Sequence, residues 1–420
     1  MLKIVFKNTF YQILSKIFTA GGALFGTVLI TRFLGAETFG EYSIVTAFVL
    51  SFYLLSDLGI NAVTVKEFSQ DETALRKNFS SILVFRVVLG LVFAGLCNLV
   101  LIFFPYSPII KNAIRFGSIL IFLQSIYSTC LIVFQSKLAY RYVVSISILA
   151  SLISIALLIP VVFMHKSIFY VILAVVAGYS FHPITALLLL RKYLRFDKRS
   201  IDIAYWKRVF VLSFPLGLAL MLNTFMVQAD KILLSVMSDA VSVGLYNLAY
   251  KIFDLILVIP TFFMNAMFPL MVKAKDDNGC KVNILLKKSL LILSLAAIFL
   301  TVFSFIFSRF LIPAIWGGEM VLSYIPFNIL MAGAVFFFLS SPLTWVLVVK
   351  NRQGVLPFLY GFALLFNVIL NIIFIPQYNY LASAVITVLT EFLVLAVLAV
   401  IVFLAEYRRM GRLLKIRRLR

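Results

Sequence analysis

The stretch FGEYSIVTAF at residues 39–48 guides the interpretation of the whole chain, because a similar stretch, VGLYNLAYKI, recurs at residues 243–252. In both copies a glycine, one intervening residue and a tyrosine open a long apolar run, and the copies are 204 residues apart. Two further pairs match at similar offsets: Asn61-Ala62 with Asn265-Ala266, and ALLIP at 156–160 with IIFIP at 372–376. These pairs indicate an internal duplication. The alternative, that helix starts in membranes commonly use Gly and Tyr, stays open.

The composition predicts an integral membrane protein. Of the 420 residues 63% are hydrophobic and 13% are charged, and the mean hydropathy is +1.10. Soluble domains are about half apolar and a quarter charged. Lipid is therefore the solvent that this composition requires, and each spanning helix needs about 20 apolar residues.

Twelve apolar runs are bounded by charged residues or by Pro and Gly. Barrel strands alternate over about ten residues, whereas these runs are continuous and longer, so the sequence predicts an all-α membrane protein. The predicted spans are 10–33, 42–65, 80–104, 113–135, 143–163, 168–190, 209–236, 244–271, 289–307, 321–349, 355–375 and 381–404.

The basic residues predict the orientation of these spans. The net charge is +21, but the basic residues cluster in short segments between apolar runs, which is typical of cytoplasmic loops rather than of nucleic-acid binding. With the N-terminus inside, the inner segments hold 28 Lys and Arg residues and the outer segments hold five. We therefore expect both termini in the cytoplasm, with the N-terminal apolar run retained as the first span and not cleaved as a signal peptide.

Cysteine and histidine are too few and too scattered for a metal centre. Cys97, Cys130 and Cys280 form no CxxC pair, and His165 and His182 share no metal-ligand spacing. We expect neither a disulfide framework nor a metal site.

The duplication predicts two six-span lobes. The N-terminal lobe covers 1–190, a basic cytoplasmic linker 191–208, the C-terminal lobe 209–404 and a basic cytoplasmic tail 405–420. Because six is even, both lobes cross the membrane in the same sense, and a pseudo-two-fold axis along the membrane normal would relate them. The tail has the pattern of a basic amphipathic helix on the inner leaflet.

Several motifs resemble a known family. RFLGAETFGEYS at 32–43 with DLGINAVTVKE at 57–67 resembles the opening of polysaccharide flippases of the Wzx type, which share a superfamily with MATE exporters and MurJ-type lipid II flippases. The later matches are SFPLGLALMLNTFMVQADKILLS at 213–235, VGLYNLAYKIFD at 243–254 and NVILNIIFIPQYNYLASAVITVLTE at 367–391. At Tyr378-Asn379-Tyr380 the chain departs from the family, which usually has a Gly-containing turn there.

The resemblance implies a transporter and not an enzyme. The family has twelve helices in two six-helix lobes around a central cavity. Its members move oligosaccharide repeat units, linked to an undecaprenyl-pyrophosphate-type lipid, from the cytoplasmic to the outer leaflet of the plasma membrane. They do so by alternating access, for O-antigen, capsule or exopolysaccharide synthesis, without ATP. The resemblance implies no cofactor, leaves coupling to H⁺ or Na⁺ open, and suggests other polysaccharide assembly proteins as partners in a bacterial or archaeal plasma membrane.

Four basic residues fall inside predicted spans and are the candidate substrate-binding groups. Intramembrane charge usually faces a wet cavity or a partner, and a pyrophosphate headgroup needs neutralisation when it leaves water. The four residues are Lys231, Lys251, Arg86 and Lys16. Arg86 and Lys16 have an alternative, in which they extend to the cytoplasmic interface. Lys251 has another, because Asp254 lies three residues away on the same helix face.

Acidic residues within spans are candidates for ion coupling. Asp230, Glu391 and Asp57 could each titrate or bind Na⁺ in a cavity. The alternative is that these residues balance the cations or cap breaks in helices. Pro215 and Gly217 stand early in the seventh span, where loss of a backbone hydrogen bond would let the helix bend during transport.

Three other functions compete with the flippase. A MATE-type drug or cation antiporter should carry a net acidic cavity, whereas the spans hold four basic and four acidic residues. A membrane polysaccharide polymerase or glycosyltransferase usually has a large outer loop or a catalytic carboxylate cluster, and a channel has a repeated filter loop. The predicted outer loops are short and carry no DxD motif, so the sequence favours the flippase.

Overall fold

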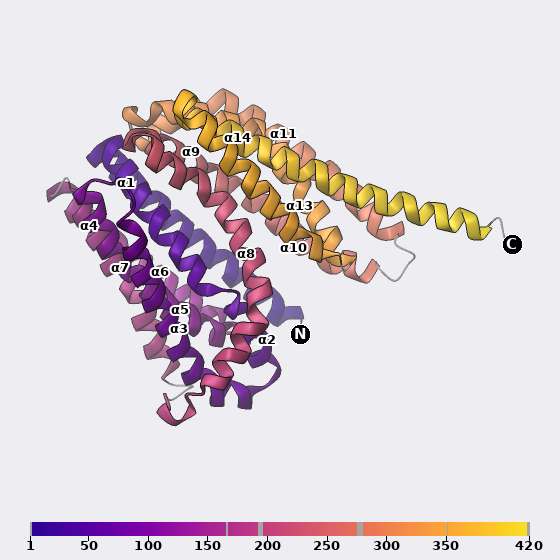
Figure 1. Cartoon of the computed structure of the whole chain (residues 1–420), viewed down its shortest axis with the longest axis horizontal. Helices are drawn as coiled ribbons and strands as arrows, with labels where there is room; N and C mark the ends of the chain where they lie inside the picture. Colours follow the sequence, from indigo (N-terminus) through magenta and orange to yellow (C-terminus); the bar gives the residue numbers. More distant parts are fainter. Residues whose placement is uncertain (1, 165–166, 192–195, 275–279, 351, 418–420) are drawn as a thin grey trace. The chain divides into compact units, whose positions relative to one another are not determined.

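The computed structural model describes residues 2–164, 167–191, 196–274, 280–350 and 352–417. Within these ranges the chain forms helices and connecting turns and no β-strand, as Figure 1 shows. In unit 1, defined below, the α-helices are α1 (Leu2–Asp57), α2 (Ile60–Gln70), α3 (Glu72–Leu101), α4 (Pro108–Gly117), α5 (Ile119–Ser136), α6 (Tyr140–Met164), α7 (Ile168–Leu190) and α8 (Ile203–Met237). The α-helices that follow are α9 (Ala240–Ile256), α10 (Val258–Lys273), α11 (Cys280–Trp316), α12 (Tyr324–Ala332), α13 (Ala334–Val349) and α14 (Leu356–Arg417).

All twelve predicted spans fall on described helices. Among the described residues, eight helical segments are long and apolar enough to cross a membrane, and the bent pair α12–α13 makes a ninth. Two of the eight contain 40 and 50 residues, about twice the length that a bilayer requires. Each of these two is interrupted by a non-helical residue, Gly35 in α1 and Asn379 in α14, so each accounts for two predicted spans. The protein is an all-α, multi-pass membrane protein.

Hydrogen bonds show that α14 folds back on itself. The Ser383 hydroxyl donates to the Asn371 side-chain oxygen at 2.9 Å, across 12 residues. A continuous helix would separate these residues by about 18 Å, at a rise of 1.5 Å per residue. The reversal occurs at Asn379, whose φ of 53° lies in the left-handed region. Asn tolerates this region, which explains how the chain turns here without the glycine that the family usually has.

α1 reverses in the same way at Gly35. Its φ of 86° is in the left-handed region, where glycine meets no steric penalty. Thr19 and Tyr42 lie on opposite sides of this residue, 23 positions apart, and yet they line one pocket. The two arms of α1 are therefore the first two spans.

Two compact units make up the chain. Unit 1 comprises Met1–Gly244 together with Ile315–Glu319, and unit 2 comprises Leu245–Ala314 and Met320–Arg420. This division assigns α8 to unit 1, whereas the duplication in the sequence assigns it to the C-terminal lobe. The lobe boundaries at 190 and 209 stay a prediction that rests on the repeat.

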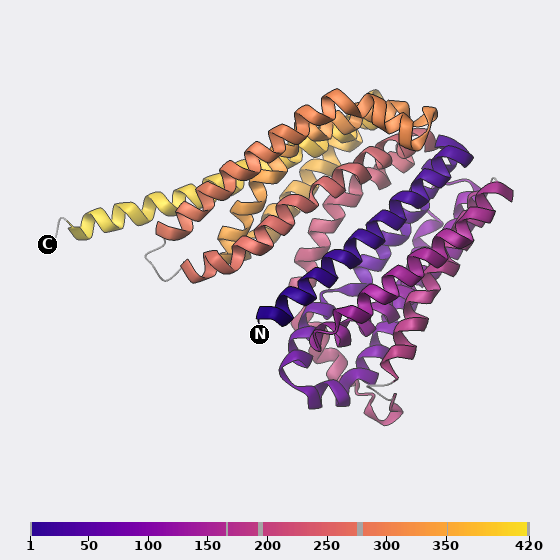
Figure 2. The ribbon, with the colours of Figure 1, turned by 180° about the vertical axis from the view of Figure 1, so that it is seen from behind.

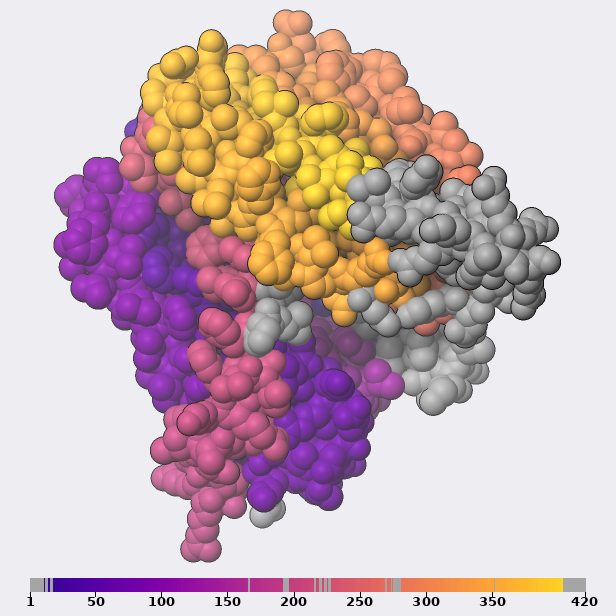
Figure 3. Space-filling view, turned by 45° about the vertical axis from the view of Figure 1, so that its right-hand side comes forward, coloured from indigo at the N-terminus to yellow at the C-terminus, as the bar shows by residue number. Residues whose placement is uncertain are grey.

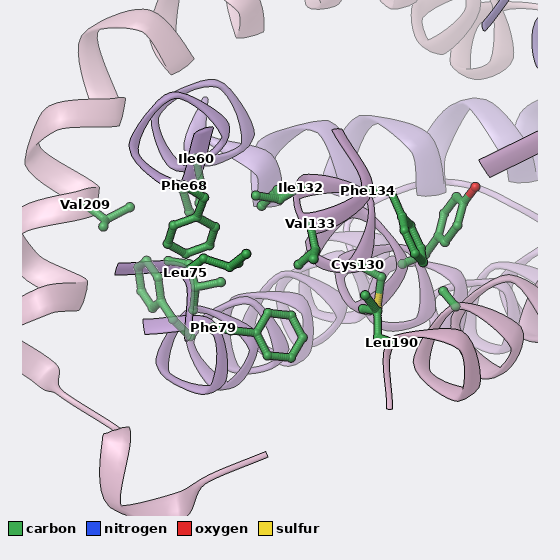
Figure 4. Packing of buried hydrophobic residues seen from close by; sticks show 14 of the residues in the cluster. Ile60, Phe68, Leu75, Phe79, Cys130, Ile132, Val133, Phe134, Leu190 and Val209 are labelled. Carbon is green, nitrogen blue, oxygen red and sulfur yellow. The ribbon is translucent and has the colours of Figure 1, made fainter. Parts of the chain in front are cut away.

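The helices of unit 1 pack as a bundle. α1 lies along α6, and α6 lies along α7, as Figures 1 and 2 show. A buried cluster joins α2, α3, α5 and α8 at one end, and Figure 4 shows Phe68, Leu75, Phe79 and Val209 within it. α8 packs against α1, α2 and α3, and Figure 3 shows it in rose beside the purple helices of this unit.

Polar residues shape the turn between α2 and α3. Asp71 accepts hydrogen bonds from the Thr73 amide at 2.8 Å and the Thr73 hydroxyl at 2.6 Å. These bonds stabilise the charged carboxylate and lower the pKa of Asp71 below its usual range. The Asp71 side chain thus caps the start of α3, in a turn that lies between two apolar segments.

In unit 2, α14 packs against α12 and α13, and α10 packs against α13. α11 presents large apolar side chains outward, with Leu291, Leu295 and Phe299 each more than 60% exposed. These residues are spaced by one helical turn and form one stripe. A continuous apolar stripe of this kind is what a lipid-facing helix requires.

The glycines of the two repeated stretches pack against each other. A Cβ on Gly40 would lie 1.7 Å from the Ala240 carbonyl oxygen, and a Cβ on Gly244 would lie 3.2 Å from the Gly40 Cα. Only glycine allows backbones this close. The duplicated Gly-x-Tyr therefore marks the point where the second arm of α1 meets the start of α9.

This crossing predicts a strong effect of one methyl group. Gly40→Ala should destabilise the protein by about 1–3 kcal/mol or more, because the new Cβ meets rigid backbone. The measurement is the midpoint of thermal unfolding in detergent. Gly95→Ala is the matched control, since nothing lies within 4 Å of its Cβ position. Equal midpoints for the two variants would contradict the crossing.

Candidate functional site

Arg86 lies at the centre of a polar cluster inside unit 1. Its side chain is fully buried in α3, and one terminal nitrogen donates to the Asp57 carboxylate at 2.6 Å. The same nitrogen donates to Ser128 at 2.6 Å and to Asn61 at 3.2 Å. The sequence alternative that Arg86 extends to the interface is therefore wrong, and in this structure its charge is balanced by Asp57.

This cluster closes a break between α1 and α2. The helix ends at Asp57, and the next two residues, Leu58 and Gly59, have φ values of 45° and 73°. The other terminal nitrogen of Arg86 donates to the backbone carbonyls of Ser56 and Asp57, each at 3.2 Å. Carbonyls at a helix end lack partners within the helix, so Arg86 satisfies groups that lipid could not. The Asp57 carboxylate balances the charge of Arg86, which is one of the alternatives that the sequence left open beside ion coupling.

Gly217 holds this break from the side of α8. A Cβ on Gly217 would lie 2.2 Å from the Leu58 carbonyl oxygen, and a Cβ on Gly59 would lie 2.7 Å from the Gly217 amide nitrogen. Gly217 therefore allows backbone contact with the break. The predicted bend at this position stays a prediction, and the Pro215 side chain lies outside the part of the chain that the structure describes.

Asp230 and Lys231 are both buried in α8, with exposed fractions of 1% and 8%. Burial of an ionised side chain is expensive unless it is paired or solvated in a cavity. The burial of Lys231 is consistent with a place in such a cavity, and Lys231 remains a candidate substrate-binding residue. Its role, like that of Asp230, stays a prediction.

The remaining candidates are distributed over both units. Lys251 belongs to unit 2, where its side chain is half-buried, and Asp254 is exposed. Lys16 belongs to α1, but its side chain lies outside the described residues. A common cavity for the four cations stays a prediction.

Glu391 lies on a polar seam within unit 2. It is buried and accepts a hydrogen bond from the Ser340 hydroxyl of α13. Thr390, the residue before Glu391, accepts a hydrogen bond from the Asn367 side chain at 3.4 Å. Thr387, one helical turn earlier, shares a hydrogen bond with the Tyr246 hydroxyl at 3.0 Å. The seam gives Glu391 a structural role in joining helices, and ion coupling through it stays a prediction.

The segment Ile315–Glu319, which contains the last two residues of α11, belongs to unit 1. Glu319 accepts a hydrogen bond from the Ala36 amide at 2.8 Å, and the Ile315 carbonyl accepts one from Arg32 at 2.7 Å. Trp316 donates to the Thr27 hydroxyl at 3.1 Å. Ala36 is the first residue after the reversal at Gly35, so Glu319 supplies a negative charge to a helix start. Nothing in the sequence pattern links positions so far apart.

Unit 1 also contains a polar pocket that the sequence did not indicate. Its volume is about 240 Å³, and α1, α5, α6 and α7 line it. Tyr42 of the repeated stretch lines it together with Tyr127, Tyr179 and His182. Each helix supplies a polar side chain from an otherwise apolar run, and a continuous apolar run does not show which of its faces turns inward.

A comparison with known protein families gives a match over most of the chain. The polysaccharide biosynthesis protein family matches residues 5–275. The chain belongs to this family. No curated protein matches its sequence significantly.

Solved structures similar to this family member are transporters. The lipid II flippase MurJ in an inward closed conformation has a TM-score of 0.77 at 14% identity, over 94% of this chain and 87% of that chain. An inward-facing multidrug resistance MATE transporter of the MOP superfamily has a TM-score of 0.78 at 11% identity, over 97% of this chain and 99% of that chain. The MATE transporter VcmN of Vibrio cholerae has 0.65 at 11% identity, over 98% and 97%. The chain therefore shares the fold of these transporters.

The Arg86 cluster generates a prediction about stability. Arg86→Leu should destabilise the protein by about 3–5 kcal/mol, because it leaves Asp57 and two carbonyls without their buried partner. Arg76→Leu is the matched control on the same helix. Arg76 pairs with Glu72 at 3.3 Å, but its side chain is 66% exposed, and exposed pairs contribute about 0–1 kcal/mol.

The measurement is again thermal unfolding in detergent, together with the yield of folded protein. A large loss for Arg86→Leu beside a small one for Arg76→Leu is the expected result. Equal losses would show that burial does not distinguish the two ion pairs.

Proposed function

We propose that this chain is a flippase for lipid-linked oligosaccharide. It would move repeat units carried on an undecaprenyl-pyrophosphate-type lipid from the cytoplasmic to the outer leaflet of a bacterial or archaeal plasma membrane. The observation that carries the proposal is membership of the polysaccharide biosynthesis family in a chain with a flippase-like fold. Such a protein transports and performs no covalent chemistry.

The cargo is anionic at its headgroup, and basic side chains are the expected counter-charges. In this proposal Lys231 contacts the pyrophosphate, and Lys251 is a second predicted contact. A lysine ammonium acts as a compact point charge with three donors, and its attraction to phosphate is strong because it is shielded from water. Lys231 is the stronger candidate because it is 92% buried.

The positive-inside bias supports cytoplasmic termini, with the basic stretch 191–208 on the same side. The cycle needs no bound cofactor. An H⁺ or Na⁺ gradient is one source of energy, and the buried carboxylates Asp230 and Glu391 are the groups that could couple to it.

A MATE-type exporter of drugs or cations is the second candidate. One observation favours it: the TM-score to a MATE transporter is 0.78, and the TM-score to MurJ is 0.77. The family match favours glycan transport over drug export.

Deletion of the gene tests the proposal in cells. In a strain without a redundant flippase, lipid-linked repeat units should accumulate on the cytoplasmic leaflet and surface glycan should be lost. Normal surface glycan in that strain would refute the proposal. Normal surface glycan together with altered drug resistance in that strain would favour the exporter.

Complementation tests the leading residue. Lys231→Ala should lower glycan export at least tenfold at wild-type protein levels, because loss of a desolvated charge contact costs about 2–5 kcal/mol. Lys66→Ala is the control, since Lys66 is an exposed basic residue of α2. Full export by Lys231→Ala would remove this residue from the substrate path.

A further inference from the structure

The polar pocket of unit 1 has a composition that neither the proposed headgroup contacts nor the packing of the helices explains. Its lining includes three tyrosines, one glutamine, one histidine, and several serine and threonine hydroxyls. None of the described lining residues is Asp, Glu, Lys or Arg. The side chains that the argument uses are Tyr42, Gln124, Tyr127, Ser154, Tyr179 and His182.

Two polar atoms of this lining are buried without a hydrogen-bond partner. They are the Ser154 hydroxyl of α6 and the His182 Nδ1 of α7. The Tyr179 carbonyl lies near the imidazole but does not meet hydrogen-bond geometry at Nδ1. The His182 side chain is 93% buried. Because an unsatisfied buried polar group costs about 1–3 kcal/mol, these two atoms point to a polar ligand.

Aromatic rings form one wall beside these groups. The centroid of the His182 ring lies 4.8 Å from that of Tyr127 and 5.2 Å from that of Tyr179. Tyrosine combines an apolar ring with a hydroxyl that donates and accepts. The wall therefore offers both a surface for C–H groups and hydrogen bonds at its edge.

The lining excludes several classes of ligand. A metal cation would require carboxylates or other strong ligands, and a phosphate would require arginine or lysine. An acyl chain would leave the hydroxyls and the amide unpaired in an apolar contact. An uncharged ring with several hydroxyl groups matches what remains, because each hydroxyl both donates and accepts.

The volume limits the ligand to one ring. Sites for drug-sized molecules occupy about 300–1,000 Å³, and this pocket has about 240 Å³. A chain of sugars would not fit within it.

We propose that this pocket binds one uncharged sugar ring of the transported glycan. The inference rests on the proposed function, and it adds a site for the sugar in unit 1 that is distinct from the lysines assigned to the pyrophosphate. Tyr42 gives the repeated Gly-x-Tyr stretch a binding role in its first copy. In the second copy, Tyr246 is fully buried and bonds Thr387.

The test uses purified full-length protein in proteoliposomes. The cargo is the lipid-linked glycan extracted from the deletion strain, and undecaprenyl pyrophosphate, which carries no sugar, is the competitor. The double variant Ser154→Ala, Gln124→Ala removes two hydrogen-bonding groups from the pocket lining. The serine substitution hardly changes the volume of the side chain. Below saturation, it should transport the glycan lipid at least tenfold more slowly than the wild type, because sites built to bond hydroxyl groups depend strongly on them.

Inhibition by undecaprenyl pyrophosphate should stay within twofold of the wild type, since the headgroup contacts are intact. Ser180→Ala is the matched control. Ser180 lies on α7 and bonds the Ala177 carbonyl at 2.6 Å, outside the pocket, and this variant should transport normally.

Three outcomes would overturn the inference. Unchanged transport by the double variant would show that the pocket binds no part of the transported glycan. Equal loss of glycan transport and of headgroup inhibition would show a general structural effect. If the wild type itself moved no glycan lipid, the proposed function would fall, and this inference with it.

Discussion

In lipid a broken helix leaves carbonyl and amide groups that no water can satisfy. This chain contains such a break after Asp57, and Arg86 closes it by bonding two carbonyls and the Asp57 carboxylate. Gly217 of α8 then packs directly on the broken backbone. The second arm of α1, the short helix α2, and α3 and α8 therefore meet at one point whose geometry depends on a single guanidinium group.

The duplicated Gly-x-Tyr connects the sequence to this architecture. The sequence predicted related halves from two similar stretches, and the structure shows that their glycines touch. Gly40 and Gly244 allow α1 and α9 to cross at backbone distance. Their tyrosines differ in use, because Tyr42 lines the polar pocket and Tyr246 joins the seam with Thr387. The two similar stretches thus share a packing role for their glycines and differ in the roles of their tyrosines.

Hydrophobicity and span length predicted the all-α membrane fold and the approximate positions of the long helices, although not the separate short helices α2 and α4. They could not predict how the helices face one another, because a run that is apolar all round carries no inward face. Arg86 illustrates the consequence. Its type and depth suggested a substrate contact or an interfacial position, whereas its partners Asp57, Asn61 and Ser128 come from three other stretches. The contact of Glu319 with Ala36 and the pocket around His182 depend on similar long-range packing.

Family membership and fold support the proposed transport function, and unit 1 contains both a buried lysine, Lys231, and an uncharged, hydroxyl-rich pocket. The central claim is that the chain moves a glycan carried on a lipid pyrophosphate. Reconstitution of the purified protein with extracted lipid-linked glycan on one leaflet measures this most directly, by the rate at which the glycan becomes accessible to a lectin on the other side. The account predicts a rate that rises with protein density and exceeds that of protein-free vesicles. A rate equal to that of protein-free vesicles, with active export of a cationic drug by the same preparation, would contradict it.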